Sequence, residues 1–552
     1  MVSEWLSQLS SLSGTPVDYL KLFGLFLLSY PLAYPLPYLS PRAKHIANVV
    51  LSTFFLVPVM NLYSGYLQLL GTSLLTYVMV KYKVGGKRMP WLVFAGQMGH
   101  LTINHLVRHF GSIPLTTIEI TAAQMVLVMN LTTFAWDCYD GRQRSVEQCD
   151  DAQKKTRIAE MPSILEFLGY AFYFPGVMIG PSTRFADYKK WADGSLFPLS
   201  KSEKAKGENG KPVVSVNGNG PGHEPRPPPA GRVSAALTEL GVGLVFMAIY
   251  SLYSAQWDYF RLITPVAEGG VREWAWWKRI AFANAAGFFA RTKYYAVWSL
   301  TNGACIMSGL GFYGISPDGK TKWNRCQNIN IAKIEFANNW KELLDAWNMN
   351  TNVWLRNNVY KRLTRPGRKP GFKTTMATFL TSAFWHGVAP GYYVAFFLAG
   401  VQSSIARQLR RHVRPIFFAD TRAPNPSFGT LSRYSPSQLV YAGCSIAAVQ
   451  FTLNFTVAPF LVLDFGKSIA AYHSMCWYGA IMAFGSMVFF RMGGARWLDQ
   501  QSGRVRRPRG VTSASDITDG DDEVAGSKKT AGEHLVPDLD AVEAVAKEAV
   551  AK

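Results

Sequence analysis

The sequence predicts an all-α, polytopic membrane protein, and three observations support that fold class. The chain of 552 residues is 49% hydrophobic but only 17% charged, whereas soluble proteins carry about 25% charged residues. Its apolar residues stand in long continuous blocks, and its charges, with a net value of +21, gather between those blocks. Only helices and closed barrels satisfy the backbone in lipid, and these blocks are too long and too continuous for barrel strands.

The apolar blocks, taken in chain order, are the predicted transmembrane helices. About 20 residues cross the hydrocarbon core, and many blocks reach that length. Others are shorter or contain histidine, asparagine and proline, so we expect some to be broken, tilted or re-entrant. The estimate is roughly eleven membrane crossings. The blocks cover residues 20–39, 46–56, 63–80, 91–107, 118–136, 165–179, 237–253, 281–307, 372–385, 392–405, 438–462 and 469–490.

These blocks form one predicted polytopic domain over residues 1–500. Two polar segments lack the apolar residues needed to fold alone. One is the loop 201–231, rich in Gly, Pro, Lys and Asn, and the other is the charged tail 501–552. Both are predicted to be disordered and cytosolic.

The basic residues lie mainly in connectors, such as residues 81–88, 361–373 and 491–509. In a soluble protein this charge would suggest nucleic acid, but no nucleic-acid motif accompanies it. The positive-inside rule and anionic headgroups explain the charge more simply. The predicted partners are therefore membrane lipids and not nucleic acid, and the sequence leaves the oligomeric state open.

The most informative stretch runs from Trp347 to His386. His386 stands in an apolar run, and an amide-rich segment that contains Asn348 precedes it across a basic connector. Ionisable residues inside a bilayer are costly, so each is a functional candidate. The structural alternatives are a histidine that packs or hydrogen-bonds between helices and an asparagine that caps a helix.

Other polar groups have plainer interpretations. His100, His105 and His109 lie on one helical face and are expected to line a polar cavity. Asp137 and Asp140 are expected to make structural hydrogen bonds. The six cysteines form no CxxC pattern, so neither a disulfide framework nor a metal site is predicted. Cys138 or Cys305 could in principle be an acyl nucleophile, but both are expected instead to be small buried residues.

Five sets of sequence blocks follow one another along the chain: Ile120–Met125 with Phe134–Arg142, Tyr173–Pro181 with Phe185–Tyr188, Lys293–Tyr295 with Gly303–Phe312, Trp347-Asn348 with Trp354-Leu355, Val359-Tyr360 and Lys361-Arg362, and Trp385-His386-Gly387 with Pro390–Tyr393. In this order they resemble the membrane-bound O-acyltransferase (MBOAT) family, above all its fungal lysophospholipid acyltransferase branch. The resemblance covers about residues 15–490. One block departs from it, because Asn302 stands where relatives often carry Glu, which puts in doubt any role for a carboxylate there.

The resemblance implies an internal catalytic tunnel and direct transfer of an acyl chain from acyl-CoA to the free hydroxyl of a lysophospholipid. His386 would be the general base and Asn348 the supporting amide, with Asn350 and Asn352 as fallback candidates. Acyl-CoA would be a co-substrate, with no cofactor and no metal. The implied location is the endoplasmic reticulum membrane, as a multi-pass protein. The candidate substrate-binding residues are Trp385, Asn350, Arg356, Lys361, Arg362 and Arg365.

The four basic candidates, Arg356, Lys361, Arg362 and Arg365, have two interpretations of similar weight. They could bind the phosphates of CoA, or they could anchor the chain at the membrane interface. For the whole chain, the alternative enzyme reading is a different acceptor, namely diacylglycerol, a sterol or a protein. The alternative from another class is a lipid transporter or scramblase, in which His386 would relay protons. Inverted repeats would favour a transporter, and the sequence shows none.

Overall fold

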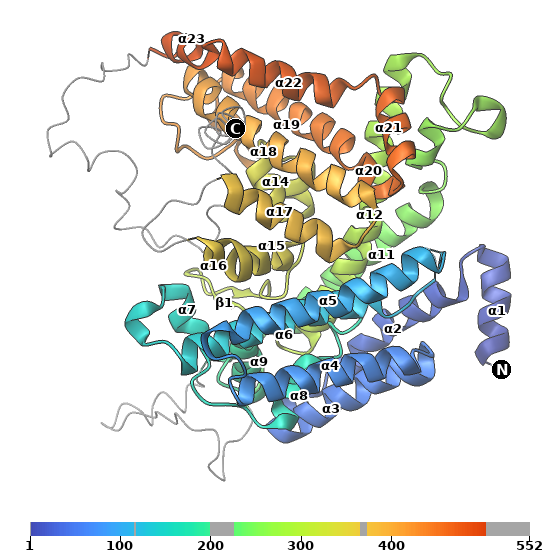
Figure 1. Cartoon of the computed structure of the whole chain (residues 1–552), viewed down its shortest axis with the longest axis vertical. Coiled ribbons are helices and arrows are strands. Elements are labelled where there is room, and N and C mark those ends of the chain that lie inside the picture. Colours follow the sequence, from blue (N-terminus) through green and yellow to red (C-terminus); the bar gives the residue numbers. More distant parts are fainter. Residues whose placement is uncertain (1, 115–116, 199–225, 365–371, 504–552) are drawn as a thin grey trace, which may run out of the picture.

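The computed structural model describes residues 2–114, 117–198, 226–364 and 372–503, and these residues are mostly helical (Figure 1). The strands β1 (Gly314–Ile315) and β2 (Thr321–Lys322) form a small antiparallel pair. The predicted all-α class is therefore confirmed. Most of the loop 201–231 and nearly all of the tail 501–552 lie outside the described residues.

The N-terminal part of the chain forms a bundle of helices at the bottom of Figure 1. Ser40 and Ser163 begin two of these helices by accepting hydrogen bonds from backbone N–H groups of the first turn, as N-cap residues do. The α-helices are α1 (Val2–Ser13), α2 (Val17–Ala33), α3 (Pro41–Phe54), α4 (Tyr63–Lys81), α5 (Met89–Phe110), α6 (Thr121–Arg142), α7 (Asp151–Thr156), α8 (Ile164–Ala171) and α9 (Phe185–Ala192). Short 3₁₀ or π turns between them are η1 (Leu36–Tyr38), η2 (Phe55–Val59), η3 (Gly86–Arg88) and η4 (Val146–Gln148).

The middle of the chain joins this bundle to the C-terminal helices. The long helix α12 packs along α11 and contacts both α2 and α19, so it belongs to both halves of the molecule. The helices of this part are α11 (Arg232–Tyr253), α12 (Trp276–Met307), α13 (Ile331–Glu335), α14 (Trp340–Ala346), α15 (Met349–Leu355), α16 (Lys361–Leu363) and α17 (Phe372–His386). The turns η5 (Tyr259–Leu262), η6 (Val266–Glu268) and the π-helical η7 (Arg356–Tyr360) complete it.

The C-terminal helices form the top of Figure 1. Their central member, α18, packs against α17, α19 and α20. A capping box at Ser435 and Gln438 begins α19, and such reciprocal bonds satisfy the free N–H groups of a first turn. The elements are α18 (Pro390–Phe417), η8 (Phe428–Arg433), α19 (Pro436–Thr456), α20 (Ala458–Val462), α21 (Phe465–Ser474), α22 (Tyr478–Arg491) and α23 (Gly494–Gln501).

Three helical stretches among the described residues are long and apolar enough to cross a membrane: Val17–Tyr38, Arg232–Tyr253 and Pro436–Val462. These criteria do not establish the roughly eleven crossings that the sequence predicts. Helices such as α6 are less apolar because they contain more polar residues, and these side chains face protein. Thr132 of α6, for example, accepts a hydrogen bond from the indole of Trp354 at 2.9 Å, and most of α6 is buried.

Two predicted helical blocks are wrong in extent. The block 165–179 forms only the short α8, because the chain after Ala171 turns at Pro175 and Gly176 and does not continue as a helix. The block 469–490 is divided between α21 and α22, since Cys476 and Trp477 both adopt φ near +54°. That left-handed conformation ends a helix.

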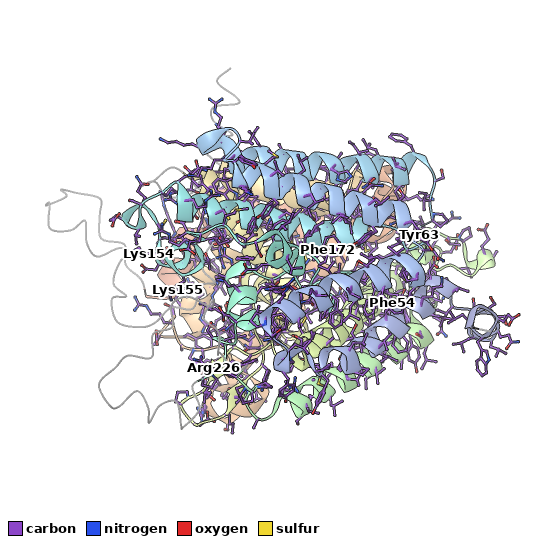
Figure 2. The ribbon with its side chains drawn as sticks, turned by 90° about the horizontal axis from the view of Figure 1, so that it is seen from below. Phe54, Tyr63, Lys154, Lys155, Phe172 and Arg226 are labelled. Atoms are coloured by element: carbon purple, nitrogen blue, oxygen red, sulfur yellow. The ribbon has the colours of Figure 1, made fainter. Side chains whose placement is uncertain are left out.

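Charged and aromatic side chains separate along the N-terminal bundle. In Figure 2, Lys154, Lys155 and Arg226 lie at one end of the helices, whereas Phe54 and Tyr63 lie toward the other. Phe54 and Tyr63 are exposed, at 44% and 58%. A charged end and an apolar exposed surface are what a protein at a membrane interface presents.

The junction between α18 and α20 yields a stability prediction. A Cβ on Gly391 would lie 2.1 Å from the backbone oxygen of Pro459 and 2.8 Å from Leu463, so Gly391→Ala must displace backbone. We expect a loss of about 1–3 kcal/mol in unfolding free energy, measured as a lower Tm of the purified protein in detergent.

The matched control is Gly443→Ala in α19, where a Cβ would meet nothing within 4 Å. Alanine is the better helix former, so this variant should keep or raise the Tm. Equal melting temperatures for Gly391→Ala and the unchanged protein would contradict the close approach of α18 and α20.

Candidate active site

The structure places His386 and Asn348 on the wall of one cavity. The cavity has a volume of about 240 Å³ and lies among α12, α14, α15, α17, α18, α19 and α20. Its wall is mostly apolar and aromatic, and includes Tyr294, Trp298, Trp347, Leu355, Phe379, Phe396, Leu453, Phe460 and Leu461. The two predicted catalytic residues, which come from different helices, therefore share an apolar, cavity-shaped site of the kind that binds small molecules.

His386 is the last residue of α17, and the next residue explains why the helix ends there. Gly387 has φ +143°, a conformation that side-chain-bearing residues rarely adopt, and Pro390 then begins α18. The imidazole stacks on Phe396 with ring centres 5.2 Å apart and meets Phe460 edge-on at 5.0 Å. No group in the described part of the chain hydrogen-bonds the imidazole, so its nitrogens remain available to a substrate.

His105 of α5 supports the same end of α17. Its Nε2 lies 3.2 Å from the backbone oxygen of Trp385, and it is itself buried. This contact holds the residue before His386 in place from a neighbouring helix. The sequence predicted only a polar cavity lining for His105, since spacing along α5 does not reveal a partner that lies on α17.

Asn348 stands at the N-terminus of α15 with φ +43° and ψ +54°, a left-handed conformation that asparagine tolerates better than most residues. Its Oδ1 accepts hydrogen bonds from Nδ2 of Asn328 at 3.1 Å and from the hydroxyl of Thr351 at 2.8 Å. It does not cap a backbone N–H of the first turn. The side chain of Asn348 therefore does not act as a helix cap, which was the structural alternative for this residue.

A chain of hydrogen bonds fixes which end of the Asn348 amide faces which way. The backbone N–H of Asn350 donates to Oδ1 of Asn328 at 3.0 Å, and a backbone N–H can only donate. Asn328 must then donate through Nδ2, and Asn348 must accept through Oδ1. The NH₂ of Asn348 thus remains free of described partners, and it can donate to a substrate oxygen.

The two fallback amides have other partners. Asn352 lines the same cavity but donates to the backbone oxygen of Leu344 at 2.8 Å. Asn350 does not line this cavity, because its side chain bonds to Asn328. Of the amides predicted for the site, Asn348 alone, among the described residues, combines the cavity wall with an uncommitted NH₂.

Trp385 lies in the core and not on the cavity wall. Its indole donates to the backbone oxygen of Met125 at 3.1 Å, and its ring packs on Trp354 with centres 5.9 Å apart. The structure thus gives this predicted substrate-binding residue a packing role between α6, α15 and α17. It still sets the position of His386, which follows it directly.

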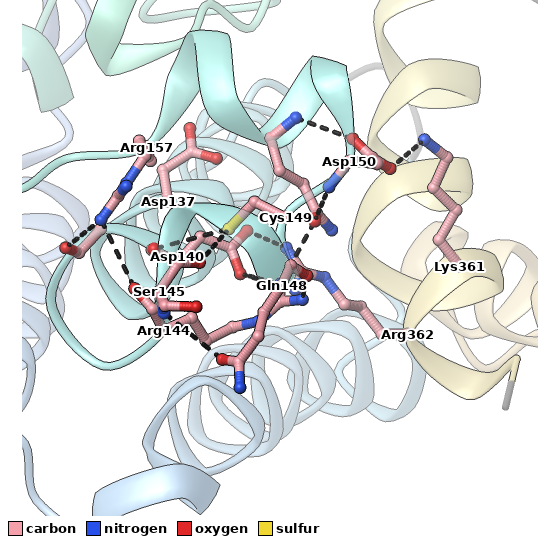
Figure 3. A network of polar contacts seen from close by, with 12 residues as sticks. Asp137, Asp140, Arg144, Ser145, Gln148, Cys149, Asp150, Arg157, Lys361 and Arg362 are labelled. Atoms are coloured by element: carbon pink, nitrogen blue, oxygen red, sulfur yellow. Dashed lines mark hydrogen bonds and ion pairs between the residues drawn. The ribbon is translucent and has the colours of Figure 1, made fainter. Parts of the chain in front are cut away.

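Two of the four predicted basic residues, Lys361 and Arg362, are engaged by carboxylates of the α6–α7 region (Figure 3). Arg362 binds both oxygens of the buried Asp140, one of them at 2.9 Å, and covers the ring of Trp136 at 4.1 Å. Lys361 pairs with Asp150 at 2.9 Å. Partial burial raises the pKa of the Asp150 carboxyl, but the hydrogen bonds from Lys361 and from backbone N–H groups lower it below its usual value.

These contacts bind α16 to the N-terminal bundle, which is a structural role for Arg362 and Lys361. Arg356 is buried at the start of η7, and Arg365 lies outside the described residues. Asp140 makes the structural hydrogen bonds expected of it, since it also pairs with Arg144 at 2.7 Å. Binding of CoA by the basic connector stays a prediction.

Two polar features near the site were not foreseen. Arg291 on the cavity wall is neutralised by Glu335 at 2.9 Å. Asn302 is buried in α12, where the carboxylate of Glu239 from α11 faces it. A carboxylate is thus present beside position 302, but α11 supplies it. Both partners are distant in sequence, so no local pattern could have identified them.

The cysteines lie away from the cavity. Cys138 and Cys305 are buried in the core of the N-terminal bundle, together with Phe134 and Tyr173. No cysteine lies among the described residues that line the cavity with His386. The geometry therefore offers an imidazole and an amide for acyl transfer, but no thiol.

Comparison with known proteins finds acyltransferases among the similar chains. The chain is 36% identical to the lysophospholipid acyltransferase of Schizosaccharomyces pombe over 83% of this chain and 84% of that one. It is 36% identical to the Saccharomyces cerevisiae lysophospholipid acyltransferase, over 80% and 68% of the two chains. It is 28% identical to human membrane-bound glycerophospholipid O-acyltransferase 1, over 93% and 95%.

The profile of the membrane-bound O-acyltransferase family matches residues 108–434. That region is more than half of the chain and contains both Asn348 and His386. The resemblance found in the sequence is confirmed: the chain belongs to the membrane-bound O-acyltransferase family.

Proposed function

We propose that this protein is a lysophospholipid acyltransferase, which moves an acyl chain from acyl-CoA to the free hydroxyl of a lysophospholipid. The observation that carries the proposal is the placement of His386 and Asn348 on one apolar cavity. Both groups are free to reach a substrate, and the surrounding wall suits an acyl chain. The names of the two fungal relatives support the choice of a lysophospholipid as acceptor.

The proposed reaction uses each group once. The imidazole of His386 takes the proton of the acceptor hydroxyl while the hydroxyl oxygen bonds to the thioester carbon. The carbonyl oxygen gains negative charge, and Nδ2 of Asn348 donates a hydrogen bond to it. The C–S bond then breaks, the CoA thiolate leaves, and the imidazolium returns the proton to the sulfur. The products are a diacyl phospholipid and free CoA.

The proposal includes a membrane setting. The three stretches that can span a membrane would be joined by the other long helices, which gives a polytopic fold of roughly eleven crossings. We place this fold in the endoplasmic reticulum membrane, with the basic connectors on the cytosolic side. An apolar chain would then enter the cavity from lipid while its polar head stays near water.

The direct test is an assay of the purified protein with acyl-CoA and a panel of acceptors. We expect a diacyl phospholipid to form from lysophospholipids, and no comparable product from diacylglycerol or a sterol. Transfer to a sterol or diacylglycerol in preference to every lysophospholipid would overturn the proposed acceptor. Movement of lipid between leaflets without any acyl transfer would overturn the assignment of this protein as an enzyme.

For the base, we expect His386→Ala to lower kcat by roughly 10²–10⁴-fold, because the hydroxyl would lose its proton acceptor. His473→Ala is the matched control, since His473 is exposed in α21 and should keep full turnover. Both variants should retain the Tm of the unchanged protein within a few degrees. Wild-type turnover in a folded His386→Ala protein would remove this residue from the mechanism.

For the amide, the most selective change is Asn348→Asp. The carboxylate can still accept from Asn328 and Thr351, but it replaces the free NH₂ with an oxygen that repels the developing charge. We expect kcat to fall by roughly 10²–10³-fold. The control is Asn357→Asp, because Asn357 belongs to η7 and does not line the cavity. An equal loss in both variants would show a general charge effect.

The proposed reaction forms no covalent acyl-enzyme intermediate. We therefore expect a variant with all six cysteines replaced by alanine to keep its turnover if it folds. The buried cysteines contribute packing, so its Tm should fall while its activity per folded molecule stays the same. Mass spectrometry of the unchanged protein during turnover should find no acylated cysteine. A stable acyl adduct on Cys305 or Cys138 would contradict direct transfer.

A further inference from the structure

A second pocket, polar and smaller, lies on the other side of α15. Its volume is about 150 Å³, and its wall includes Ser182, Thr183, Arg184, Asp187 and Arg325. We propose that this pocket binds a phosphate group of one of the two substrates while the acyl chemistry proceeds in the apolar cavity. The inference rests on the proposed function and assigns to Arg184 the principal contact.

The two cavities use two faces of one helix. Asn348, Thr351 and Leu355 face the apolar cavity, and their spacing of three to four residues is that of one helical face. Val353 and Trp354, with Asn350, face the polar pocket. The short helix α15, which lies among α6, α14 and α17 (Figure 1), is therefore the wall between them.

The cavities approach each other at the N-terminus of this wall. Asn328 bonds both to Asn348, on the apolar side, and to Asn350, on the polar side, at 3.1 Å in each case. The proposal requires the linker of the substrate to pass this end of α15, with the apolar chain on one face of the helix and the polar head on the other. Both proposed substrates have that shape: in acyl-CoA a linker separates the phosphates from the thioester carbon, and in the lysophospholipid a short glycerol segment separates the phosphate from the reacting hydroxyl.

Arg184 has guanidinium N–H groups to offer. Its described partner is the carboxylate of Asp137, at an N–O distance of 3.8 Å, which is too long for a hydrogen bond. Its side chain is 22% exposed, so it is partly desolvated but reachable. Within the described residues, no hydrogen bond from its guanidinium is found, and phosphate is the group that a planar guanidinium binds best.

The remaining charges favour an anion. Arg325 also faces the pocket, and it holds Asp187 at 2.6 Å while its Nε donates to the backbone oxygen of Phe312. The one carboxylate on the wall is thus already paired. The wall itself carries two guanidinium groups and one carboxylate, and the second carboxylate nearby, Asp137, lies off the wall at 3.8 Å from Arg184. The hydroxyl-bearing Ser182 and Thr183 add further donors.

The phosphate could belong to CoA or to the lysophospholipid headgroup, and substrate kinetics separate the two. Arg184→Gln should raise the KM for one substrate roughly tenfold or more, as loss of a charge-assisted hydrogen bond does. The same KM should lose much of its dependence on salt. A rise confined to acyl-CoA assigns CoA phosphate, and a rise confined to the lysolipid assigns the headgroup.

The matched control is Lys189→Gln. Lys189 lies in α9, the helix that directly follows Arg184, and pairs with Glu166, but its side chain is 56% exposed and it does not line the pocket. Neither KM should change in this variant. Because Arg184→Gln also removes a partner of Asp137, a second pair of variants tests the pocket without touching Arg184.

That second pair is Val353→Glu and Val353→Gln. Val353 is 37% exposed and lines the pocket, so either side chain fits without disturbing the core. The carboxylate of Val353→Glu should raise the same KM that Arg184→Gln raises, by repelling phosphate. The neutral Val353→Gln should raise it far less.

A binding measurement separates this inference from the proposed function. The Tm of the unchanged protein should rise with free CoA or with lysophospholipid, and Arg184→Gln should lose that rise for one of them. If the protein transfers no acyl group, the proposed function fails, but the Tm shifts still test whether the pocket binds a phosphate group. If transfer occurs but Arg184→Gln and Val353→Glu leave both KM values and both Tm shifts unchanged, the phosphate pocket is wrong.

Discussion

The position of Asn328 governs the site, because its side chain is the link that orients Asn348. Its carbonyl oxygen is held by the backbone N–H of Asn350, so its NH₂ must point toward Asn348. Its own backbone oxygen also accepts from the N–H of Met349 at 2.9 Å. These bonds attach the loop before α13 to the first turn of α15. They turn an amide that could face either way into one with a single useful orientation.

The rest of the site is arranged around that fixed amide by packing. Trp354 of α15 and Trp385 of α17 lie in one buried cluster with Val128 and Met129 of α6. This cluster holds the helix that begins with Asn348 against the helix that ends with His386. The pair of Arg362 with Asp140 then binds the far end of the same segment to α6. These contacts fix the segment from α15 to α17, which forms one side of the apolar cavity.

Sequence reasoning identified the parts of this arrangement that depend on composition and local motifs. The helical class followed from long apolar blocks, and His386 and Asn348 followed from their motifs. The predicted number of roughly eleven spans stays a prediction, because helices such as α6 bury polar residues against protein and do not meet criteria based on length and hydropathy alone. The partner of Arg362 lies 222 residues away. The polar pocket joins Arg184, Arg325 and Val353 from three separate segments, so only the folded chain brings these residues together.

The left-handed backbone at Asn348 leaves this position almost no acceptable replacement. Glycine accepts the conformation, but it has no amide, and aspartate accepts it, but it has no N–H to donate. Glutamine has the right group on a longer stem, yet it is disfavoured at φ +43° and would carry its NH₂ past the point that Asn328 defines. Backbone geometry and the proposed chemistry therefore select the same side chain independently. Substitution of residue 348 is therefore disfavoured both by the backbone conformation and by the need for an amide of this length, whichever acceptor the cavity binds.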